Sequence, residues 1–301
     1  MGTISIDTFT AELPHGIRLV CRAAGRPGAP TLVFLHGFPE AAFAWDEVVQ
    51  RLAGRYRCVA PNLRGYAGSS SPAQVEAYRP KHLVQDLVEL LRQLGAPVAA
   101  LVAHDWGGAV AWNLAVQQPD LIERLVIVNS PHPGTFLREL KHNPAQQQAS
   151  AYMNFLCRPD AEQLLAADDY ARMWPFFERM GAAGERGWLT ESMRERYREV
   201  WRQGLTGPLN YYRASPLRPP TADQPGAAQV ELSAEQVTVR VPTLVLWGEA
   251  DLALPPSLLD GLDAYVPTLT LRRRPGATHW ILHEEPDWVA QQVESFVEAP
   301  A

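Results

Sequence analysis

The sequence is poor in cysteine and lysine and has no long hydrophobic run. Its 301 residues include three cysteines, Cys21, Cys58 and Cys157, which lie far apart and form no CxxC pair. No group of Cys and His has the spacing of a zinc site. We therefore expect no metal and no other cofactor, and we expect the thiols to fill small apolar spaces in a reducing compartment.

No segment resembles a targeting or membrane-spanning sequence. Residues 1–16 lack a basic stretch followed by an apolar stretch, so no signal peptide is expected. No apolar run approaches the roughly 20 residues that a membrane helix needs. These features predict a soluble, cytoplasmic protein without a membrane partner.

The charge balance argues against nucleic acid as a partner. The 27 Lys and Arg residues, of which only Lys81 and Lys141 are lysine, face 33 Asp and Glu, giving a net charge of −6. The longest basic run, 272–274, stands alone, so no basic stripe is expected. The partners expected are a small-molecule substrate and water, and a homodimer stays open because a cap face and a dimer face look alike in sequence.

Short apolar runs alternate with helical patterns along much of the chain. This alternation predicts an α/β fold, a mostly parallel sheet flanked by helices. The predicted strands are 31–35, 57–60, 98–103, 125–128, 243–247 and 269–271, and the predicted helices include 107–118, 288–297 and the apolar stripes of 45–52 and 83–94.

The stretch from about Pro131 to Arg240 has a different composition. It is rich in helical patterns, carries aromatic residues at irregular spacing and ends in a proline-rich segment. The change predicts a core made of 1–131 and 241–301, interrupted by a helical cap at 132–240.

The most informative motif, 103–108 (AHDWGG), lies between a predicted strand and a predicted helix. The pattern small-x-nucleophile-x-small is typical of a nucleophile elbow, a tight turn that projects its central side chain above the sheet. The central residue here is Asp105. Taken alone, an aspartate that caps the following helix explains the pattern equally well.

Further segments strengthen the catalytic interpretation. Asp251 follows one late strand and His279 follows the next, so the chain order is nucleophile, acid, histidine, as in α/β-hydrolase triads. Phe38 lies after an early strand, where the second oxyanion donor of such sites is found. We therefore expect the backbone N–H groups of Phe38 and Trp106 to form an oxyanion hole.

An aspartate nucleophile narrows the chemistry. A carboxylate is already ionised at pH 7, and its attack on an acyl carbon would give a costly mixed anhydride. Attack on a saturated carbon that bears oxygen or halogen gives an ordinary ester instead. His279, oriented by Asp251, would then activate water to hydrolyse the ester at Asp105. The residues favour cleavage of epoxides or carbon–halogen bonds over esters or peptides.

Over nearly its whole length the chain resembles the soluble-type epoxide hydrolases of the α/β-hydrolase superfamily, which are related to haloalkane and haloacetate dehalogenases. The resemblance rests on HGFPE (36–40), LRGY (63–66), HDWGG (104–108), SPHPG (130–134), GEAD (248–251) and THW (278–280). It implies an epoxide hydrolase, which adds water to an epoxide to give a vicinal diol.

The resemblance also implies two catalytic tyrosines in the cap. Segment 204–213 is similar to the cap segment that ends in a tyrosine donor, which places the donor at Tyr212, and segment 152–155 implies Tyr152 as its partner. Their hydroxyls would protonate the alkoxide left by ring opening. Tyr211 is the alternative to Tyr212, since a slip of one residue exchanges them.

A dehalogenase with the same triad is the first alternative. Haloalkane dehalogenases commonly have Asn where this chain has Phe38, and haloacetate enzymes have Arg where it has Trp106.

Some relatives take the triad acid from the end of the strand before the cap. That position is Asn129 here, and because an amide carries no charge, Asp251 keeps the role of the acid. A ligand-binding protein of this fold without turnover is the alternative from another class.

Several other residues near the motifs have structural interpretations. Asn62 and Ala67 depart from the Asp and Gly that are frequent in the family, which we interpret as loop variation. Arg64 is expected in a structural ion pair, and His36 and His104 are expected to order the backbone. The remaining motif-flanking histidines, expected at the surface or behind the site, are His132, His142 and His283.

Overall fold

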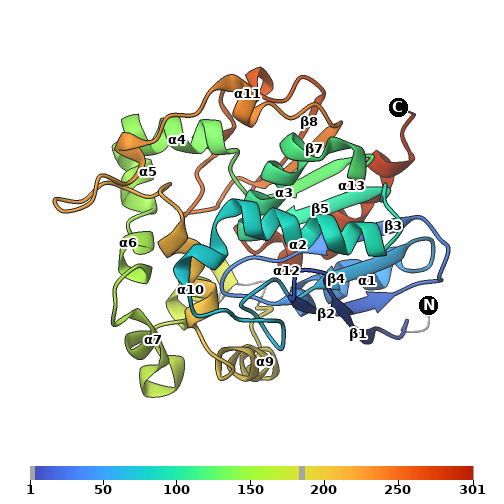
Figure 1. Ribbon diagram of the computed structural model, residues 1–301, viewed down its shortest axis with the longest axis horizontal. Coiled ribbons are helices and arrows are strands. Elements are labelled where there is room, and N and C mark those ends of the chain that lie inside the picture. Colours follow the sequence, from blue (N-terminus) through green and yellow to red (C-terminus); the bar gives the residue numbers. More distant parts are fainter. Residues whose placement is uncertain (1–3, 183–186, 301) are drawn as a thin grey trace.

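A computed structural model describes residues 4–182 and 187–300 and confirms the α/β architecture (Figure 1). Its strands form one sheet in the order β1-β2-β4-β3-β5-β6-β7-β8. The pairs from β4 to β8 are parallel, while β1 pairs with β2, and β2 with β4, in antiparallel fashion. The strands are β1 Asp7–Glu12, β2 Arg18–Ala24, β3 Thr31–Leu35, β4 Arg57–Pro61, β5 Ala100–His104, β6 Leu125–Val128, β7 Thr243–Gly248 and β8 Leu269–Arg274.

All six predicted strands are present, but the N-terminal pair β1 and β2 was not predicted. The inner strands are buried on both faces and read as continuous apolar runs. In β2 buried residues alternate with Arg18 and Arg22, so no apolar run marks the strand. The start of β5 also lies later than expected, because Val98 forms only an isolated bridge to Ile122.

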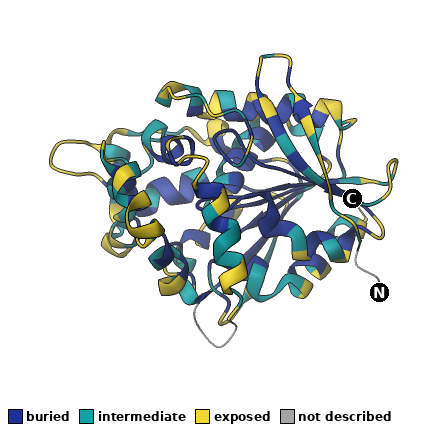
Figure 2. Ribbon diagram, turned by 90° about the horizontal axis from the view of Figure 1, so that it is seen from below, coloured by how far each residue is buried: buried dark blue, intermediate teal, exposed yellow. Residues whose placement is uncertain are grey.

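Helices cover both faces of the sheet, as Figure 2 shows with the buried strands between two helical layers. Leu32 and Phe34 of β3 point toward the layer of α1 and α13, whereas Val33 and Leu35 point toward α2 and α3. These core helices are α1 Asp46–Leu52, α2 Pro80–Gln93, α3 Asp105–Gln117, α12 Ile281–Glu284 and α13 Pro286–Glu298. The helix α2 ends close to the end of the predicted stripe 83–94, and Gly95, with a φ of +87°, lies just beyond it.

Between β6 and β7 the described residues form helices and no strand, and in Figure 1 most of this segment projects beyond one end of the sheet. The elements are α4 Pro133–His142, α5 Pro144–Ala149, α6 Tyr152–Leu156, α7 Ala161–Tyr170, α8 Trp174–Phe177, η4 Glu178–Ala182, α9 Glu191–Trp201, α10 Thr206–Ala214, η5 Gly226–Gln229 and α11 Ala234–Val237. The cap boundaries at 132 and 240 stay a prediction. The short 3₁₀ turns elsewhere are η1 Ala42–Trp45, η2 Val75–Tyr78, η3 Pro119–Leu121, η6 Pro256–Leu259 and η7 Leu262–Ala264.

Aromatic side chains join the helical segment to the core. Phe177 stacks on Trp280 with ring centroids 4.6 Å apart, and Tyr197 of α9 stacks on Trp201. The indole of Trp201 donates a hydrogen bond to the carbonyl of Pro39 at 2.8 Å. These rings contact several short helices at once, which is why their spacing in the sequence follows no single helical period.

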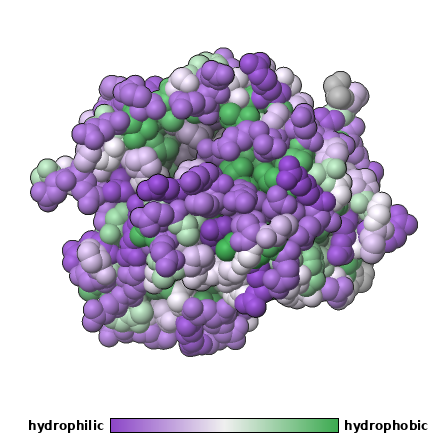
Figure 3. All heavy atoms as spheres, in the orientation of Figure 1, coloured by the Kyte–Doolittle hydropathy of each residue, from purple (hydrophilic) through white to green (hydrophobic). Residues whose placement is uncertain are grey.

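The surface is largely polar. Hydrophilic residues cover most of the face drawn in Figure 3, and Leu252 is the one large hydrophobic residue with an exposed side chain within the described ranges. Of the helices that can be described, none is long and apolar enough to cross a membrane.

Candidate active site

Asp105 lies at the junction of β5 and α3 in a strained turn. Its φ is +48°, a left-handed conformation that costs energy for a residue with a side chain. A Cβ on Gly107 would lie 2.6 Å from the carbonyl oxygen of Leu35, and one on Gly108 would lie 2.3 Å from Cβ of Ser130. Only glycine fits at these two positions, because the backbone of Leu35 approaches Gly107 and the side chain of Ser130 approaches Gly108.

The structure brings the three predicted triad residues together at the carboxyl ends of β5, β7 and β8. Nδ1 of His279 lies 2.7 Å from Oδ2 of Asp251, and its Nε2 lies 3.8 Å from Oδ2 of Asp105. The other oxygen of Asp251 accepts hydrogen bonds from the backbone N–H groups of Ala253 and Leu254, each at 2.9 Å. His279 therefore lies between a fixed, buried carboxylate and the carboxylate of the elbow.

The electrostatics of this group hold a proton on His279. Burial by itself lowers the pKa of the imidazole, but the Asp251 carboxylate and, more weakly, Asp105 outweigh it and raise the pKa to about 9. At neutral pH the side chain is thus an imidazolium as long as both carboxylates are ionised.

Asn129 supports the acid from the end of β6. Its amide nitrogen donates to Oδ2 of Asp251 at 2.8 Å, and its amide oxygen accepts from the backbone N–H of Gly248, also at 2.8 Å. The sequence excluded Asn129 as the acid but did not predict this contact. Its position at the end of the strand before the cap was the available signal.

The backbone N–H of Phe38 already points at the elbow, donating to Oδ1 of Asp105 at 2.7 Å. A Cβ on the preceding Gly37 would lie 2.2 Å from the same oxygen, so a glycine is needed for this approach. Trp106 follows Asp105 in the first turn of α3, where backbone N–H groups have no acceptor within the helix. The N–H of Phe38 is therefore in place at the carboxylate, while the role of the Trp106 N–H stays a prediction.

Two cavities meet at Asp105. One has a volume of about 240 Å³ and the other about 650 Å³, and Asp105, Tyr152 and Tyr212 line both. Trp106 lines the smaller cavity and His279 the larger. A molecule with a substituent on each side can thus reach the carboxylate with one substituent in each cavity.

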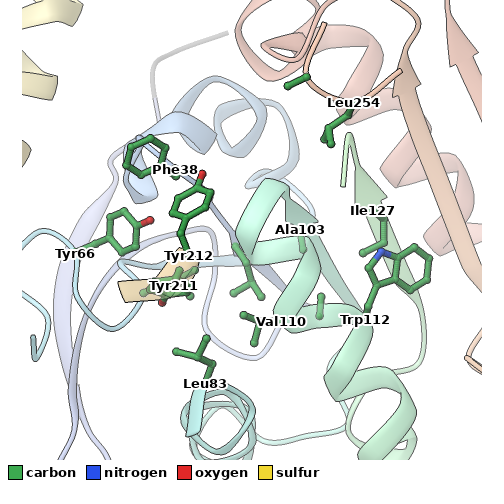
Figure 4. Packing of buried hydrophobic residues seen from close by; sticks show 14 of the residues in the cluster. Phe38, Tyr66, Leu83, Ala103, Val110, Trp112, Ile127, Tyr211, Tyr212 and Leu254 are labelled. Carbon is green, nitrogen blue, oxygen red and sulfur yellow. The ribbon is translucent and has the colours of Figure 1, made fainter. Parts of the chain in front are cut away.

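The two predicted tyrosines face one another across this junction. The ring of Tyr212 lies 6.1 Å from that of Tyr152, 5.0 Å from that of Trp106 and 5.3 Å from that of Phe38, and Figure 4 shows Tyr212 beside Phe38. Burial raises the pKa of both tyrosines, so their hydroxyls keep their protons at neutral pH.

Tyr211, the alternative to Tyr212, has a different environment. It also lines the smaller cavity, but its hydroxyl donates a hydrogen bond to the carbonyl of Arg64 at 2.9 Å. The guanidinium of Arg64 forms the expected ion pair, with Asp86 at 2.6 Å. The hydroxyl of Tyr211 therefore already donates its proton in a hydrogen bond to the loop that carries Arg64.

Glu40 joins a buried group that the sequence analysis did not identify. Its carboxylate accepts from the hydroxyl of Tyr197 at 2.7 Å and lies 2.6 Å from Nε2 of His283 and 3.5 Å from Nδ1 of His104. Burial alone would raise the pKa of Glu40, but the two histidines outweigh it and hold the pKa below its usual range. The loop that carries Phe38 is thereby fixed to α9 and to the segment after His279.

Further polar residues order the backbone around the site. Nε2 of His36 accepts from the backbone N–H of Leu63 at 3.1 Å, and burial lowers the pKa of His36 to about 4. A ring nitrogen of His104 lies 3.0 Å from the carbonyl oxygen of His279. Asn62 binds the carbonyl of Ala67, whose φ is +24°.

His132 and His142 lie away from the reacting groups. His132 is buried, not on the surface, and contacts the carbonyl of Val237 at 2.8 Å, while His142 is exposed at the end of α4. Within 4–182 and 187–300, no group of three or more His, Cys, Asp or Glu is arranged to hold a metal ion.

Comparison with known proteins assigns the family. A family model described as the alpha/beta hydrolase fold matches residues 30–286. The chain is 34% identical to AB hydrolase superfamily protein YfhM of Bacillus subtilis, over 94% of this chain and 95% of that protein. It belongs to the α/β-hydrolase fold family.

Relatives whose names state an activity indicate which family within the α/β-hydrolases this chain belongs to. The chain is 32% identical to Epoxide hydrolase 4 of Mus musculus, over 94% of this chain and 77% of that protein. The crystal structure of an epoxide hydrolase from Bacillus megaterium in complex with an inhibitor superposes with a TM-score of 0.88 at 28% identity, over 97% of this chain and all of that one. Within the α/β-hydrolases the chain belongs to the epoxide hydrolase family, as the sequence motifs predicted.

Proposed function

We propose that this protein adds water to an epoxide to give a vicinal diol, through an ester formed on Asp105. The observation that carries the proposal is the position of Asp105 between two cavities, with two protonated tyrosines on the cap side and His279 behind it. The membership in the epoxide hydrolase family supports the same reaction.

In the first step an oxygen of Asp105 attacks one carbon of the ring and the bond from that carbon to the epoxide oxygen breaks. The electron pair of that bond stays on the oxygen, which takes a proton from Tyr212 or Tyr152. The raised pKa of both phenols supports this role because it keeps the proton available at neutral pH. The result is a hydroxyalkyl ester and one tyrosinate.

Ester formation changes the charge around His279. Asp105 becomes neutral, so one of the charges that hold the pKa of His279 near 9 disappears, and the imidazole releases its proton more readily. That proton, passed through water, restores the tyrosine. The histidine is then a neutral base.

In the second step His279 takes a proton from water, whose oxygen attacks the ester carbonyl of Asp105. The negative charge that develops on the carbonyl oxygen is stabilised by the N–H groups of Phe38 and Trp106. Collapse releases the diol and restores the carboxylate and the imidazolium. We propose Asp105, His279, Asp251, Tyr152 and Tyr212 as the catalytic residues.

The test is a single turnover of styrene oxide in water labelled with heavy oxygen, followed by mass spectrometry of the product and of the Asp105 peptide. The ester route puts heavy oxygen into the peptide and the unlabelled carboxylate oxygen into the diol. In His279→Gln the ester should accumulate on that peptide, because nothing activates water. Heavy oxygen in the first-turnover diol, with none in the peptide, would contradict the route.

The same experiment separates the alternatives. If no epoxide gives diol or adduct, the wild type and His279→Gln are tested with haloalkanes and fluoroacetate, where an adduct would indicate a dehalogenase. Phe38 and Trp106 in place of the Asn and Arg of those enzymes speak against that result. Binding without any product would indicate a ligand-binding protein. The cytoplasmic location and a homodimer stay predictions, the former supported by three free thiols.

A further inference from the structure

Gln146 is a buried polar residue of the cap that the proposed chemical steps do not use. It lies in α5, and its side chain is fully shielded from solvent. Burying an amide costs free energy unless the amide forms hydrogen bonds. The NH2 group of Gln146 donates to Oγ of Ser150 at 2.8 Å and to the carbonyl oxygen of Ala253 at 3.1 Å. The first partner belongs to the cap, and the second lies two residues after the triad acid.

Residues 251–254, which we call the acid loop, connect this contact to the carboxylate of Asp251. The backbone N–H groups of Ala253 and Leu254 donate to Oδ1 of Asp251, each at 2.9 Å. Leu252, which lies between the acid and these donors, is 63% exposed and contributes little packing. The hydrogen bonds at Ala253 and Leu254 are therefore important for the conformation of the loop.

A single peptide group joins Gln146 to Asp251. The carbonyl of Ala253 and the N–H of Leu254 belong to the same planar unit, whose oxygen accepts from Gln146 and whose N–H donates to Asp251. In such a chain each hydrogen bond polarises the next, so the cap amide orients the peptide group and strengthens its N–H as a donor. Over the part of the chain that the structure describes, no other hydrogen bond reaches this carbonyl.

We propose that Gln146 is a positioning residue through which the cap holds the triad acid. It acts on Asp251 through the peptide group between Ala253 and Leu254, and Asp251 in turn contacts His279. The inference rests on the proposed hydrolysis of an ester at Asp105, because that is the step in which His279 acts as the base.

The two chemical steps should respond differently when the contact is lost. Asp251 and His279 act in hydrolysis of the ester, whereas its formation uses Asp105 and the cap tyrosines. Gln146→Met fills a similar space without a donor, so it should slow hydrolysis about fivefold and change formation less than about twofold. A general loosening of the cap would slow formation as well, because Tyr152 lies at the start of α6, shortly after α5.

The experiment is a single turnover of styrene oxide, in which the ester on the Asp105 peptide is followed by rapid quench and mass spectrometry. The rise and decay of the ester give both rates. Gln147→Met is the matched control, since Gln147 is the next residue of α5 and its amide binds the carbonyl of Leu140, within the cap, at 2.8 Å. The control should leave both rates unchanged. If Gln146→Met does not fold, Gln146→Asn, whose amide is one methylene shorter, replaces it.

A second background tests whether the effect passes through the acid. Asp251→Asn should hydrolyse the ester so slowly that its decay is followed over hours, and adding Gln146→Met should slow it no further. Wild-type hydrolysis in Gln146→Met, equal slowing of both steps, or a further fivefold loss in the Asp251→Asn background would each overturn the proposal. Absence of any ester in the wild type would instead overturn the proposed function, and this inference with it.

Discussion

Asn129 and His279 bind the same oxygen of Asp251. The amide of Asn129 donates to Oδ2 at 2.8 Å, and Nδ1 of His279 lies 2.7 Å from it. Oδ2 of Asp251 therefore interacts with one neutral donor and with the imidazole. Its other oxygen accepts hydrogen bonds from two backbone N–H groups. Asn129 therefore holds the same carboxylate oxygen that contacts His279.

Asn129→Ala tests the contribution of this contact. Loss of a hydrogen bond to a charged group should slow hydrolysis of the ester about tenfold, with the adduct on Asp105 accumulating in rapid-quench experiments. The variant should also lose about 1–3 kcal/mol of unfolding free energy, because the buried N–H of Gly248 loses its acceptor.

A control variant separates slower hydrolysis of the ester from a general loss of stability. Asn143→Ala removes a side chain that caps α5 and should cost about 1 kcal/mol, without any accumulation of adduct. If Asn129→Ala hydrolyses the ester at the wild-type rate, Asn129 does not support the acid.

Tyr212→Phe and Tyr211→Phe distinguish two neighbouring residues. Removing the hydroxyl of Tyr212 should slow formation of the ester at least tenfold, with Tyr152 left as the second donor. Removing that of Tyr211 should mainly lower stability, by about 0.5–1.5 kcal/mol, since it breaks the bond to the carbonyl of Arg64. Stopped-flow measurement of the first step and urea unfolding report the two effects, and the opposite pattern would make Tyr211 the donor.

Gly37→Ala tests the close approach of the oxyanion loop. The new Cβ would lie 2.2 Å from Oδ1 and 2.3 Å from Cβ of Asp105, so the elbow or the loop has to shift. We expect a loss of ester formation of about a hundredfold or more, because a displacement of about 1 Å at the reacting group has that effect. Gly54→Ala, where a Cβ meets nothing within 4 Å, is the control and should retain activity. Normal activity of Gly37→Ala would show that the loop adapts freely.

The inner sheet and the grouping of Asp105, Asp251 and His279 could be predicted because each leaves a local signal. Strands such as Thr31–Leu35 are apolar on both faces, and the elbow needs small residues beside Asp105 for steric reasons visible in the sequence. The edge strand Asp7–Glu12 left no such signal, since only one of its six residues is buried.

The cap could be predicted only as a helical insertion. Tyr211 and Tyr212 are adjacent on α10, and the choice of Tyr212 as the donor came from the family resemblance; the hydrogen bond of Tyr211 to the loop of Arg64 left no signal in the sequence. The contact of Gln146 with Ala253 was also hidden, because it depends on how short helices pack rather than on a periodic pattern.

The raised pKa of His279 links the site to stability. The value of about 9 in the folded protein lies above the 6.5 of an unperturbed histidine, so the native state binds the proton more tightly than the unfolded chain. This contribution is complete below pH 6.5 and is lost as the pH rises to 9. With about 1.4 kcal/mol per pKa unit, it amounts to about 3 kcal/mol.

Urea unfolding of wild type and His279→Gln between pH 6 and 10 measures this contribution. The stability difference between the two should shrink by about 3 kcal/mol as the pH rises from 6.5 to 9, since glutamine does not titrate. Asp251→Asn keeps the imidazole but removes the main charge that raises its pKa, so its curve should flatten in the same window. Parallel plots of unfolding free energy against pH for wild type and His279→Gln would mean that His279 is neutral in the folded enzyme. In that case His279 could act as the base without first losing a proton after Asp105 is esterified.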